Sequence, residues 1–289
     1  MTFAQSRSLS VVVPVYNAAG ELDDCLASLK KTVPDSTPVV VIDDASPDPS
    51  VGTVLRAWKG HAGGHWQFHR NAHNLGFVAT ANRGMEMTIG DVVLLNSDTV
   101  VTPGWLRGLQ RCLGSDPAIA TATPWTNNGE IASFPAFCEC NPVPDDPSAV
   151  AAVIGASGQA LYPEIPTAVG FCMAVSRRAI ERIGVFDAQL FGKGYGEEND
   201  FSQRAIAKDW RNVIAGDVFV YHRGSASFQG EKSRRVHRAM AILDRLHPSY
   251  HRDVATFIER DPLKEVRRRL DWARLQRLSR ARNVLIVVH

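Results

Sequence analysis

Short apolar runs that end in polar turn residues recur along this chain, and they constrain its fold more than any other feature. The first, SLSVVVPVY at 8–16, is rich in β-branched residues and stops at Asn17. The second, at 39–42, runs directly into two acids. A continuous apolar run of this length is typical of a strand that is buried on both faces. The sequence therefore predicts a core built around a buried sheet.

Segments with helical spacing separate these runs. In ELDDCLASLKKT, apolar residues recur at Leu22, Cys25, Leu26 and Leu29, which places them on one face of a helix. Strands that alternate with helices imply right-handed crossovers and parallel strands covered by helices on both faces. We therefore predict one mostly parallel, doubly wound α/β domain. Its other elements are expected as strands at 65–69, 91–98, 118–129 (with a loop), 167–175 and 211–222, and a helix at 77–87.

The regular alternation weakens after about residue 117. The stretch 127–166 is rich in Pro, Asn and Ala, and a loop of that length is usually functional or mobile. We place the main domain at 1–230 and a helical, basic extension at 231–282. The last residues, NVLIVVH at 283–289, look like the first strand of a further α/β domain. We therefore expect the chain to be part of a longer protein with additional domains.

The end of the basic extension has two interpretations. Residues 264–282 hold eight Lys and Arg and two acids, with Val266, Leu270 and Ala273 at helical spacing. Such a helix either packs one stripe on the domain or lies on an anionic membrane surface. We favour packing, because charge runs are usually solvated helix faces.

Composition excludes several classes of protein. The chain of 289 residues is 45% hydrophobic and 21% charged, which is ordinary for a soluble globular protein, and its net charge of +2 gives no reason to expect a nucleic-acid partner. The N-terminus lacks the apolar stretch of a signal peptide, and no apolar run approaches the roughly 20 residues that span a bilayer. Five scattered cysteines favour reduced thiols over a disulfide framework or a zinc site. We expect a cytoplasmic protein, at most attached to the inner face of the cell membrane.

Polar side chains gather where the predicted strands end. In open parallel sheets, ligands bind at the carboxyl ends of the strands. Asp, Asn and Ser are also ordinary turn and cap residues, so each position alone has a structural explanation. Together they predict one binding site at the edge of the sheet. The residues at these ends are Pro14, Tyr16, Asn17, Asp43, Asp44, Asn71, Asn74, Asn96, Ser97, Asp98 and His222.

Seven segments in this order resemble family 2 glycosyltransferases. They are VVVPVYNA, VIDDASPD, NLGFVATANRG, VVLLNSDTVV, GFCMAVSRRAIERIGVFD, GYGEENDFSQRA and YHRGSASF, and they extend from about residue 9 to 228. The resemblance is greatest to the branch that includes bacterial rhamnosyltransferases and other builders of surface glycans. It implies the A-type glycosyltransferase fold, a nucleotide-sugar donor, a divalent cation and inversion at the anomeric carbon.

The resemblance implies a metal site of two residues. NSD is similar to the Asp-x-Asp motif of the family, with Asp98 in its metal-binding position and the neutral Asn96 in place of the first acid. His222, which precedes RGSASF, is similar to the metal-binding His. Mg²⁺ or Mn²⁺ takes oxygen ligands while keeping waters, so one carboxylate can hold such an ion against a diphosphate. The alternatives are a helix cap for Asp98 and a structural role for His222.

The nucleotide is assigned by the same resemblance. Asp44 is similar to the acid that reads a pyrimidine, whose ring N3–H is a donor that an ionised carboxylate accepts. Asp43 is the alternative, although a structural role suits it better. The other nucleotide-binding residues are predicted to be Pro14, Tyr16, Asn17, Asn74, Gly76 and Ser97. For Asn74 and Gly76, at a helix N-terminus, simple capping is the alternative.

The motif GYGEENDF supplies the predicted catalytic residues. Glu198 resembles the family's general base, and the counterpart of Glu197 tends to contact the sugar. Asp200 and Gly196 are also expected near the sugar, although Asp200 can instead pair with Arg204, four residues later on a helix. The acceptor is predicted to be a growing glycan, free or lipid-linked. Trp125 and the loop at 127–166 are where it is expected to bind.

Other functions fit the sequence less well. The first strand leads into PVYNAAG rather than Gly-x-Gly-x-x-Gly, which disfavours an NAD-binding enzyme. A glycoside hydrolase also uses two carboxylates but does not need strand-end residues for a nucleotide. A nucleotidyltransferase would carry a Gly-rich N-terminal loop ending in Arg or Lys. A non-catalytic nucleotide-sugar or glycan-binding module remains the main alternative.

Overall fold

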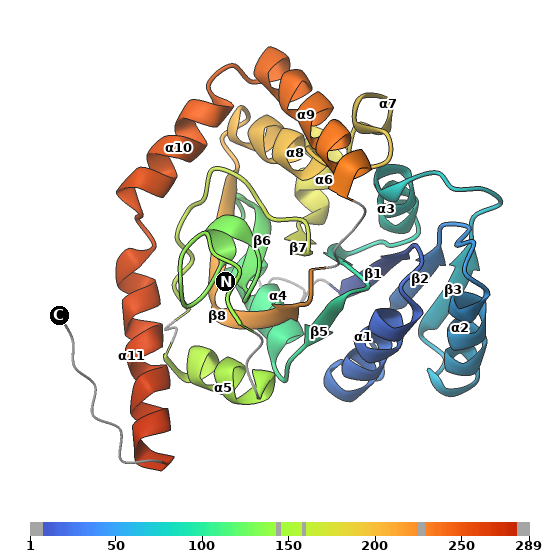
Figure 1. The fold of residues 1–289 in the computed structure, drawn as a ribbon, viewed down its shortest axis with the longest axis horizontal. Coiled ribbons are helices and arrows are strands. Elements are labelled where there is room, and N and C mark those ends of the chain that lie inside the picture. Colours follow the sequence, from blue (N-terminus) through green and yellow to red (C-terminus); the bar gives the residue numbers. More distant parts are fainter. Residues whose placement is uncertain (1–7, 143–145, 158–159, 225–228, 282–289) are drawn as a thin grey trace, which may run out of the picture.

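The structure is a computed structural model that describes residues 8–142, 146–157, 160–224 and 229–281. Within these ranges, eight strands form one sheet in the order β3-β2-β1-β4-β7-β6-β8-β5 (Figure 1). The strands are β1 (Leu9–Val15), β2 (Val39–Asp43), β3 (Trp66–Arg70), β4 (Asp91–Leu95), β5 (Thr99–Val101), β6 (Ile119–Trp125), β7 (Cys172–Val175) and β8 (Arg211–His222).

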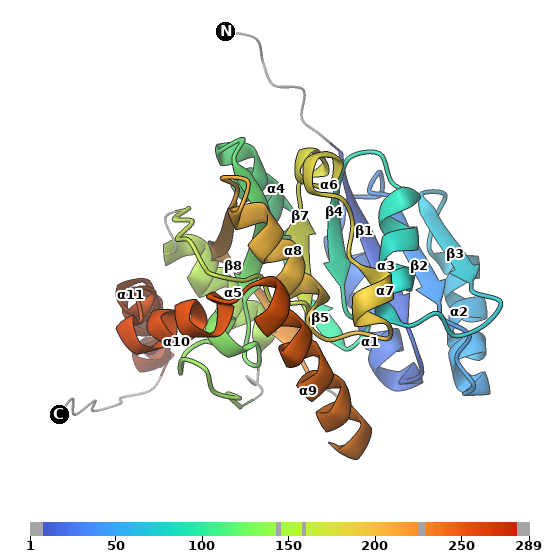
Figure 2. The ribbon, with the colours of Figure 1, turned by 90° about the horizontal axis from the view of Figure 1, so that it is seen from above.

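Helices cover both faces of this sheet. The helices are α1 (Ala19–Thr32), α2 (Pro49–His61), α3 (Phe77–Glu86), α4 (Trp105–Ser115), α5 (Pro147–Ser157), α6 (Arg177–Ile183), α7 (Ala188–Phe191), α8 (Glu197–Ile206), α9 (Gln229–Leu246), α10 (Tyr250–Arg260) and α11 (Lys264–Ala281), with a 3₁₀ turn η1 (Glu130–Ala132). Figures 1 and 2 show β3 and α2 at one end of the molecule and α10 and α11 at the other.

The two faces of the sheet bury two separate cores. Alternate residues of a strand point to opposite faces, so Val11 and Val13 of β1 join one core and Val12 joins the other. The first core lies under α1, α2, α4, α5 and α11, and the second under α3, α6, α8 and α9. The predicted doubly wound α/β fold is therefore confirmed.

The sheet is mixed rather than uniformly parallel. β3, β2, β1 and β4 are parallel to one another, and β6 is parallel to β8. β7 runs antiparallel to both of its neighbours, β4 and β6, and β5 runs antiparallel to β8. A buried strand is a continuous apolar run in either direction, so the sequence pattern did not reveal the reversal. β7 is also shorter than the predicted strand at 167–175.

The long segment 127–166 is more ordered than its composition suggests. It contains η1 and α5, and Ala151, Val153 and Ile154 of α5 are buried. The prediction of an unstructured loop was wrong over α5. The cause is that α5 is apolar on nearly all sides, so it lacks the periodic stripe that marks a surface helix.

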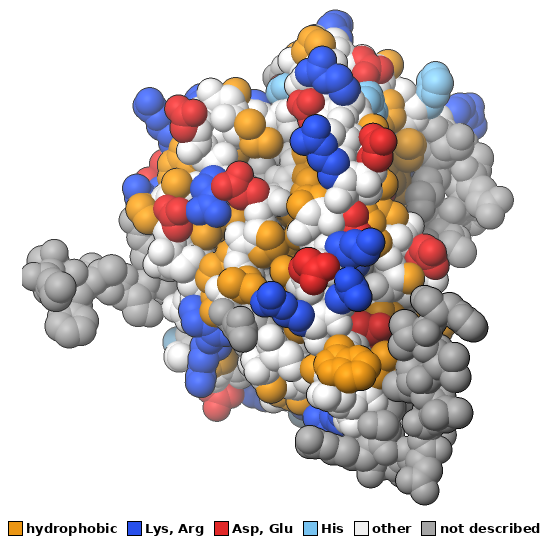
Figure 3. All heavy atoms as spheres, turned by 90° about the vertical axis from the view of Figure 1, so that its left-hand side faces the viewer, with side chains coloured by type: hydrophobic (Ala, Val, Ile, Leu, Met, Phe, Trp, Pro, Cys, Tyr) orange, Lys and Arg blue, Asp and Glu red, His pale blue; other side chains and the backbone are white. Residues whose placement is uncertain are grey.

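The basic extension packs on the rest of the protein. Ala239 and Leu243 of α9 are buried in the second core, while Leu270 of α11 is buried in the first. α11 lies against α5. On the face that α10 and α11 form, Figure 3 shows basic, acidic and apolar side chains intermixed among the described residues. These contacts agree with the packed-stripe interpretation of 264–282, part of which, like 283–289, lies outside the described residues.

No described helix is both long enough and apolar enough to cross a membrane. The five cysteines are free thiols, as the sequence predicted, and Cys25, Cys112 and Cys172 are buried.

Candidate functional site

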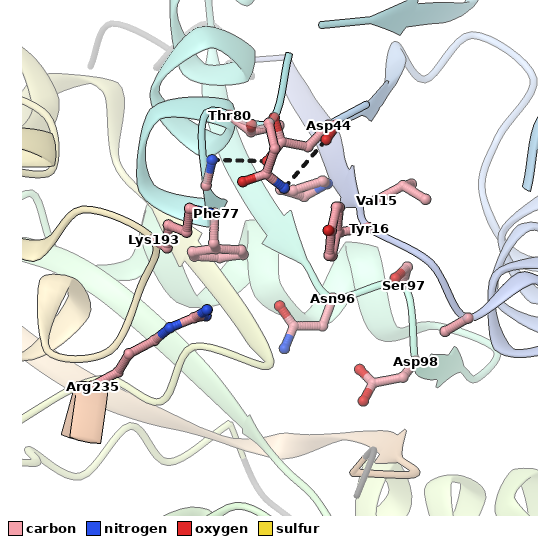
Figure 4. Close-up of a pocket in the computed structure, with 14 residues that line it drawn as sticks. Val15, Tyr16, Asp44, Phe77, Thr80, Asn96, Ser97, Asp98, Lys193 and Arg235 are labelled. Atoms are coloured by element: carbon pink, nitrogen blue, oxygen red, sulfur yellow. Dashed lines mark hydrogen bonds between the residues drawn. The ribbon is translucent and has the colours of Figure 1, made fainter. Parts of the chain in front are cut away.

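A cleft of about 280 Å³ opens at the carboxyl ends of β1, β2 and β4. The residues that line it come from these strand ends, from α3, from the glycine-rich loop before α8 and from α9 (Figure 4). They are Pro14, Val15, Tyr16, Ala18, Asp44, Asn74, Gly76, Phe77, Thr80, Asn96, Ser97, Asp98, Lys193 and Arg235. Six of the predicted nucleotide residues and the predicted metal ligand Asp98 are thus brought together, as the topology of the sheet predicts.

Asp44 lies at the inner end of this cleft, and its carboxylate accepts three hydrogen bonds from the protein. Its Oδ1 accepts from the Asn71 side chain at 2.7 Å and from the Leu75 N–H at 2.8 Å. Its Oδ2 accepts from the Gly76 N–H at 2.8 Å. An ionised carboxylate offers about four acceptor positions, so one position on Oδ2 remains for a ligand. The carboxylate therefore fixes the loop before α3 and still presents one acceptor.

The alternative acid, Asp43, has a structural role. Its carboxylate accepts from the Ser46 N–H at 2.9 Å and pairs with Arg70 of the neighbouring strand. Asp43 is buried and is not among the residues that line the cleft. The pairing holds together the ends of β2 and β3.

The start of α3 differs from the predicted anion-binding terminus. Gly76 is the N-cap, with φ of 86°, and a Cβ there would lie 2.6 Å from the Lys193 Cα. The N–H groups of Gly76 and Phe77 already donate to Asp44 and to the Lys193 carbonyl. Asn74 does not cap the helix, and its side-chain amide donates to the Asp44 carbonyl at 3.4 Å. These first N–H groups are therefore engaged by the protein itself.

Tyr16 and Asn17 follow β1 at the mouth of the cleft. The Tyr16 side chain lines the cleft and is 50% exposed, which leaves its ring available to a planar group. Asn17 adopts a left-handed backbone conformation, with φ of 62°, and its N–H donates to the Ser46 hydroxyl at 2.9 Å. Asn17 is not among the lining residues, so it shapes the turn beside them.

Asp98 and His222 meet although they are far apart in the sequence. Strand β5 starts directly after Asp98 and pairs with the end of β8, where Thr99 faces His222. The His222 Nε2 lies 3.4 Å from the Asp98 Oδ1. The alternative of a helix cap for Asp98 is not supported, because α4 begins at Trp105 with Gly104 as its N-cap.

This pair fits the chemistry of a divalent metal site. The Nδ1 of His222 lies 2.7 Å from the Asn128 carbonyl, which accepts its proton, so Nε2 is the ring nitrogen directed at Asp98. The Phe171 ring stacks on the imidazole at 5.3 Å and holds its orientation. Two ligands about 2.1 Å from one ion at a right angle lie roughly 3 Å apart, close to the observed spacing. Within the described residues no group of three or more metal-binding side chains occurs, so other ligands would come from substrate and water.

Glu197 and Glu198 begin α8 in buried surroundings. Burial raises the pKa of Glu198 to about 7. The pKa of Glu197 is raised well above its usual range by burial and by the neighbouring Glu198. Among the described residues, the Oε2 atoms of both side chains lack hydrogen-bond partners. One oxygen of each carboxyl group is therefore left without a hydrogen bond inside the protein.

Glu198 lies on the same rim as the candidate metal ligands. A Cβ on Gly170 would lie 3.7 Å from its carboxyl carbon. The next residue, Phe171, stacks on His222, and its carbonyl accepts from the Asn96 N–H at 2.9 Å. The two residues that precede β7 thus link the carboxyl group of Glu198 to His222 and to the end of β4.

The predicted sugar and acceptor residues lie elsewhere than expected. Trp125 has no exposed surface, and its indole N–H donates to the Gly216 carbonyl at 3.2 Å, so it is a core residue. Gly196 is buried, and a Cβ there would lie 2.9 Å from the Phe191 ring. Asp200 pairs with Arg204 at 2.7 Å, as the helix spacing predicts, and its other oxygen lies 2.8 Å from the His247 Nε2. In this structure Trp125, Gly196 and Asp200 stabilise the fold beside the site and do not line the cleft.

Two cations of the cleft were missed by sequence reasoning. Lys193 comes from the glycine-rich loop, and Arg235 comes from α9 in the segment treated as an extension. The loop's glycines could have drawn attention to Lys193. Arg235 is one of many arginines in a basic segment, and nothing in its local pattern separates it from the others.

Known proteins share this family and fold. The family described as glycosyl transferase family 2 matches residues 10–184. No curated protein sequence matches the chain. Among solved structures, the mannosyltransferase PcManGT of Pyrobaculum calidifontis, in complex with GDP-Man and Mn²⁺, is similar with a TM-score of 0.61 and 16% identity, over 96% of this chain and 76% of that one.

Two further structures have the same fold at similarly low identity. GalNAc-T7 with UDP, GalNAc and Mn²⁺ gives a TM-score of 0.60 at 15% identity, over 92% of this chain and 54% of that one. TarS of S. aureus (residues 1–349) with UDP-GlcNAc gives 0.57 at 15% identity, over 82% and 65%. At such identities these likenesses establish the fold alone. The family match spans more than half of the sequence, and the chain therefore belongs to glycosyl transferase family 2.

Proposed function

We propose that this glycosyltransferase is an inverting, metal-dependent enzyme that moves a sugar from a pyrimidine nucleotide-diphosphate donor to a hydroxyl of a growing surface glycan. The observation that carries the proposal is the placement of three groups around one cleft. Asp44 and Asp98 line it, His222 lies beside Asp98, and the carboxyl group of Glu198 lies against Gly170, next to the Phe171 ring that stacks on His222. Asp44 would contact the nucleobase, the Asp98–His222 pair would hold the metal ion at the diphosphate, and Glu198 would face the acceptor hydroxyl.

The single acceptor position left on Asp44 favours a pyrimidine base. Uracil and thymine present one N–H donor in their ring, flanked by carbonyl oxygens, and one acceptor satisfies it. Guanine presents an N–H and an amino group side by side, which would need both carboxylate oxygens, and Oδ1 already accepts two hydrogen bonds. The exposed Tyr16 ring provides a surface for the base to stack on. Both dTDP-rhamnose and UDP-sugars satisfy this arrangement.

Asp98 and His222 would hold Mg²⁺ or Mn²⁺. Two of the similar structures contain Mn²⁺, which supports a divalent ion of this kind. When bound, the ion would neutralise negative charge on the departing diphosphate. The Asn128 carbonyl and the Phe171 ring keep the His222 Nε2 turned toward this position.

Glu198 is proposed as the general base. It would take the proton of the acceptor hydroxyl while the hydroxyl oxygen bonds to the anomeric carbon. The bond from that carbon to the diphosphate oxygen breaks, and its electron pair leaves with the diphosphate. A carboxyl group with a pKa of about 7 is suited to this task near neutral pH, because it is ionised in part and binds a proton readily. Glu197, more deeply buried, is proposed to hold the sugar.

Thermal shift with a panel of nucleotide sugars, with and without Mn²⁺, tests the donor. We expect stabilisation by UDP- or dTDP-sugars that depends on the metal and is lost in Asp98→Ala. Transfer should be abolished in the same variant, and wild-type activity that is unaffected by EDTA would contradict metal dependence. Stabilisation by GDP-mannose alone would contradict the base assignment while leaving the family intact.

A non-catalytic nucleotide-sugar or glycan-binding module is the competing proposal. The buried Oε2 atoms of Glu197 and Glu198, which lack hydrogen bonds, and the raised pKa values of both side chains favour an enzyme, because a binding module gains nothing from acids held in this state. Release of free nucleotide from the donor in the presence of glycan acceptors would exclude the module. The rhamnosyl specificity, the lipid-linked acceptor, the cytoplasmic location and contact with the membrane surface are further proposals that rest on the sequence resemblance.

A further inference from the structure

The face of α9 that packs on the protein also directs one arginine at the cleft. Arg235, Ala239 and Leu243 are four residues apart, so they lie along one side of the helix. Ala239 and Leu243 are buried, and the Ala239 Cβ lies 3.1 Å from the position that a Cβ on Gly196 would take. This contact with the N-cap of α8 fixes the helix. Arg235, one turn earlier on the same side, lies beyond the edge of the core and lines the cleft.

Figure 4 shows the guanidinium of Arg235 directed from α9 toward Asn96, with Phe77 and Lys193 beside it. Lys193 is held by its backbone, because its carbonyl accepts from the Phe77 N–H at 3.4 Å and its Cα packs on Gly76. Among the lining residues, the acids are Asp44 and Asp98, and the cations are Lys193 and Arg235. Both cations come from the side of the cleft that α8 and α9 cover.

We propose that Arg235, assisted by Lys193, binds the diphosphate of the donor and stabilises it as it leaves. This role rests on the function proposed above. During transfer the bond between the anomeric carbon and the diphosphate oxygen breaks, and that oxygen keeps the electron pair. The acceptor oxygen takes its place on the carbon, and the acceptor proton passes to Glu198. The diphosphate therefore gains one negative charge, and a fixed guanidinium interacts more strongly with the product than with the donor.

The proposal gives the C-terminal helices a part in the reaction. Arg235 lies outside residues 10–184, the region that matches the family, and α9 is held by buried contacts of its own. At the start of α3, the N–H groups of Gly76 and Phe77 are already engaged by Asp44 and Lys193.

Equilibrium binding of UDP, dTDP and UMP to the full chain in the presence of Mn²⁺ tests this inference. Arg235→Gln should weaken UDP binding by about 10- to 100-fold, the usual worth of a hydrogen-bonded charge pair, and should change UMP binding far less. The neighbouring Arg234 is exposed on another side of α9, so Arg234→Gln is a matched control that should bind these nucleotides as the wild type does. Arg235→Lys keeps the charge and should retain an intermediate affinity for UDP.

Each outcome separates this inference from the proposed function. Equal affinity for UDP in Arg235→Gln and the wild type overturns the role of Arg235, while binding by the wild type still supports the proposed donor. Failure of the wild type to bind either UDP or dTDP in the presence of Mn²⁺ overturns both. If Arg235→Gln melts early, the comparison of Arg235→Lys with Arg234→Lys, both of which keep a cation, decides the question: equal affinities contradict a guanidinium contact.

Discussion

Adjacent positions on one helical turn give Glu197 and Glu198 different surroundings. Successive residues on a helix point about 100° apart, so the two side chains enter different parts of the interior. Glu197 is only 5% exposed, whereas Glu198 is partly exposed beside Gly170 at the rim. The Oε2 atom of each is buried, and Glu198, which keeps some exposed surface and lies beside Gly170, is the better candidate for a base that must reach the acceptor hydroxyl.

The first prediction follows from this difference. Glu198→Gln should keep donor affinity and lose transfer by roughly 100-fold or more, because the amide cannot take the acceptor proton. Glu197→Gln should instead raise the KM for the donor, since it keeps the base. Steady-state kinetics of both variants, with donor binding measured separately, checks the assignment. A dead Glu197→Gln with an active Glu198→Gln would show that the two roles are exchanged.

The pH profile supplies a second prediction. The pKa of Glu198 is raised to about 7 by burial, and a general base acts only when ionised. The value of kcat/KM should therefore fall as the pH drops below about 7 and level off above it. The profile of the free enzyme reports this group. A rate that stays flat on both sides of neutral pH would argue against Glu198 as the base.

At the scale of single elements, α3 and β1 approach each other unusually closely. A Cβ on Gly84 of α3 would lie 2.1 Å from the Val12 side chain of β1. This approach sets the distance between the sheet and α3, whose N-terminal turn lines the cleft. The position of the cleft therefore depends on a glycine that does not itself line it.

A pair of glycine substitutions tests this packing. Gly84→Ala should lower the free energy of unfolding by about 1–3 kcal/mol, because the added methyl group overpacks the contact with Val12. Gly60 of α2 is exposed with no atom near its Cβ position, so Gly60→Ala should be stabilising by about 0.4–1 kcal/mol. Urea denaturation of both variants measures the difference. Equal effects would mean that the α3–β1 contact relaxes without cost.

The sequence predicted correctly those strands and helices that are determined by local hydrophobic patterns. β1, β2, β4 and α1 follow from apolar runs and helical spacing, and the ends of β2 and β4 bring Asp44 and Asp98 to one edge. The direction of β7 and the existence of β5 depend on which strands pair, and pairing leaves no mark on a buried apolar run. Asp98 and His222 were predicted as metal ligands from the motif resemblance alone. Local sequence patterns could not bring them together, because they meet through the pairing of β5 with β8.

Tertiary packing likewise explains the errors in the site. Trp125 ends an apolar strand, where an aromatic residue can face either a ligand or the core, and only the structure shows that it faces the core. Arg235 reaches the cleft because Ala239 of α9 packs against Gly196 at the start of α8. This contact joins two separate segments of the chain, so no local sequence pattern predicts it.

At the scale of the whole molecule, the C-terminal helices α9 and α11 pack against both cores. α9 packs beside α8 in one core and α11 packs beside α5 in the other. Arg267 of α11 is nearly buried, pairs with Asp261 and lies 4.2 Å above the Phe137 ring. The extension is thus part of the folded unit that carries the site.

Substitution of Leu270 tests how much the packing of α11 contributes to the stability of the domain. Its side chain is fully buried, so Leu270→Ala should lower the free energy of unfolding by about 2–5 kcal/mol. Leu246 at the end of α9 is 39% exposed, and Leu246→Ala should cost much less. Thermal and urea unfolding, followed by circular dichroism, compare the two. A Leu270→Ala variant as stable as Leu246→Ala would show that α11 does not support the domain.

The reversal of β7 has a consequence for how this site can change. β6 and β7 are antiparallel neighbours, so the chain leaves the sheet after Trp125 and returns at Cys172 on the same edge. The segment between the two strands therefore has its ends fixed side by side. Its first and last residues belong to the site, because Asn128 and Phe171 orient His222 and Gly170 lies against Glu198. Exposed stretches between these ends, such as 138–140, can change without moving a strand. New acceptors can therefore be recruited there, while the groups proposed to bind the nucleotide stay in place.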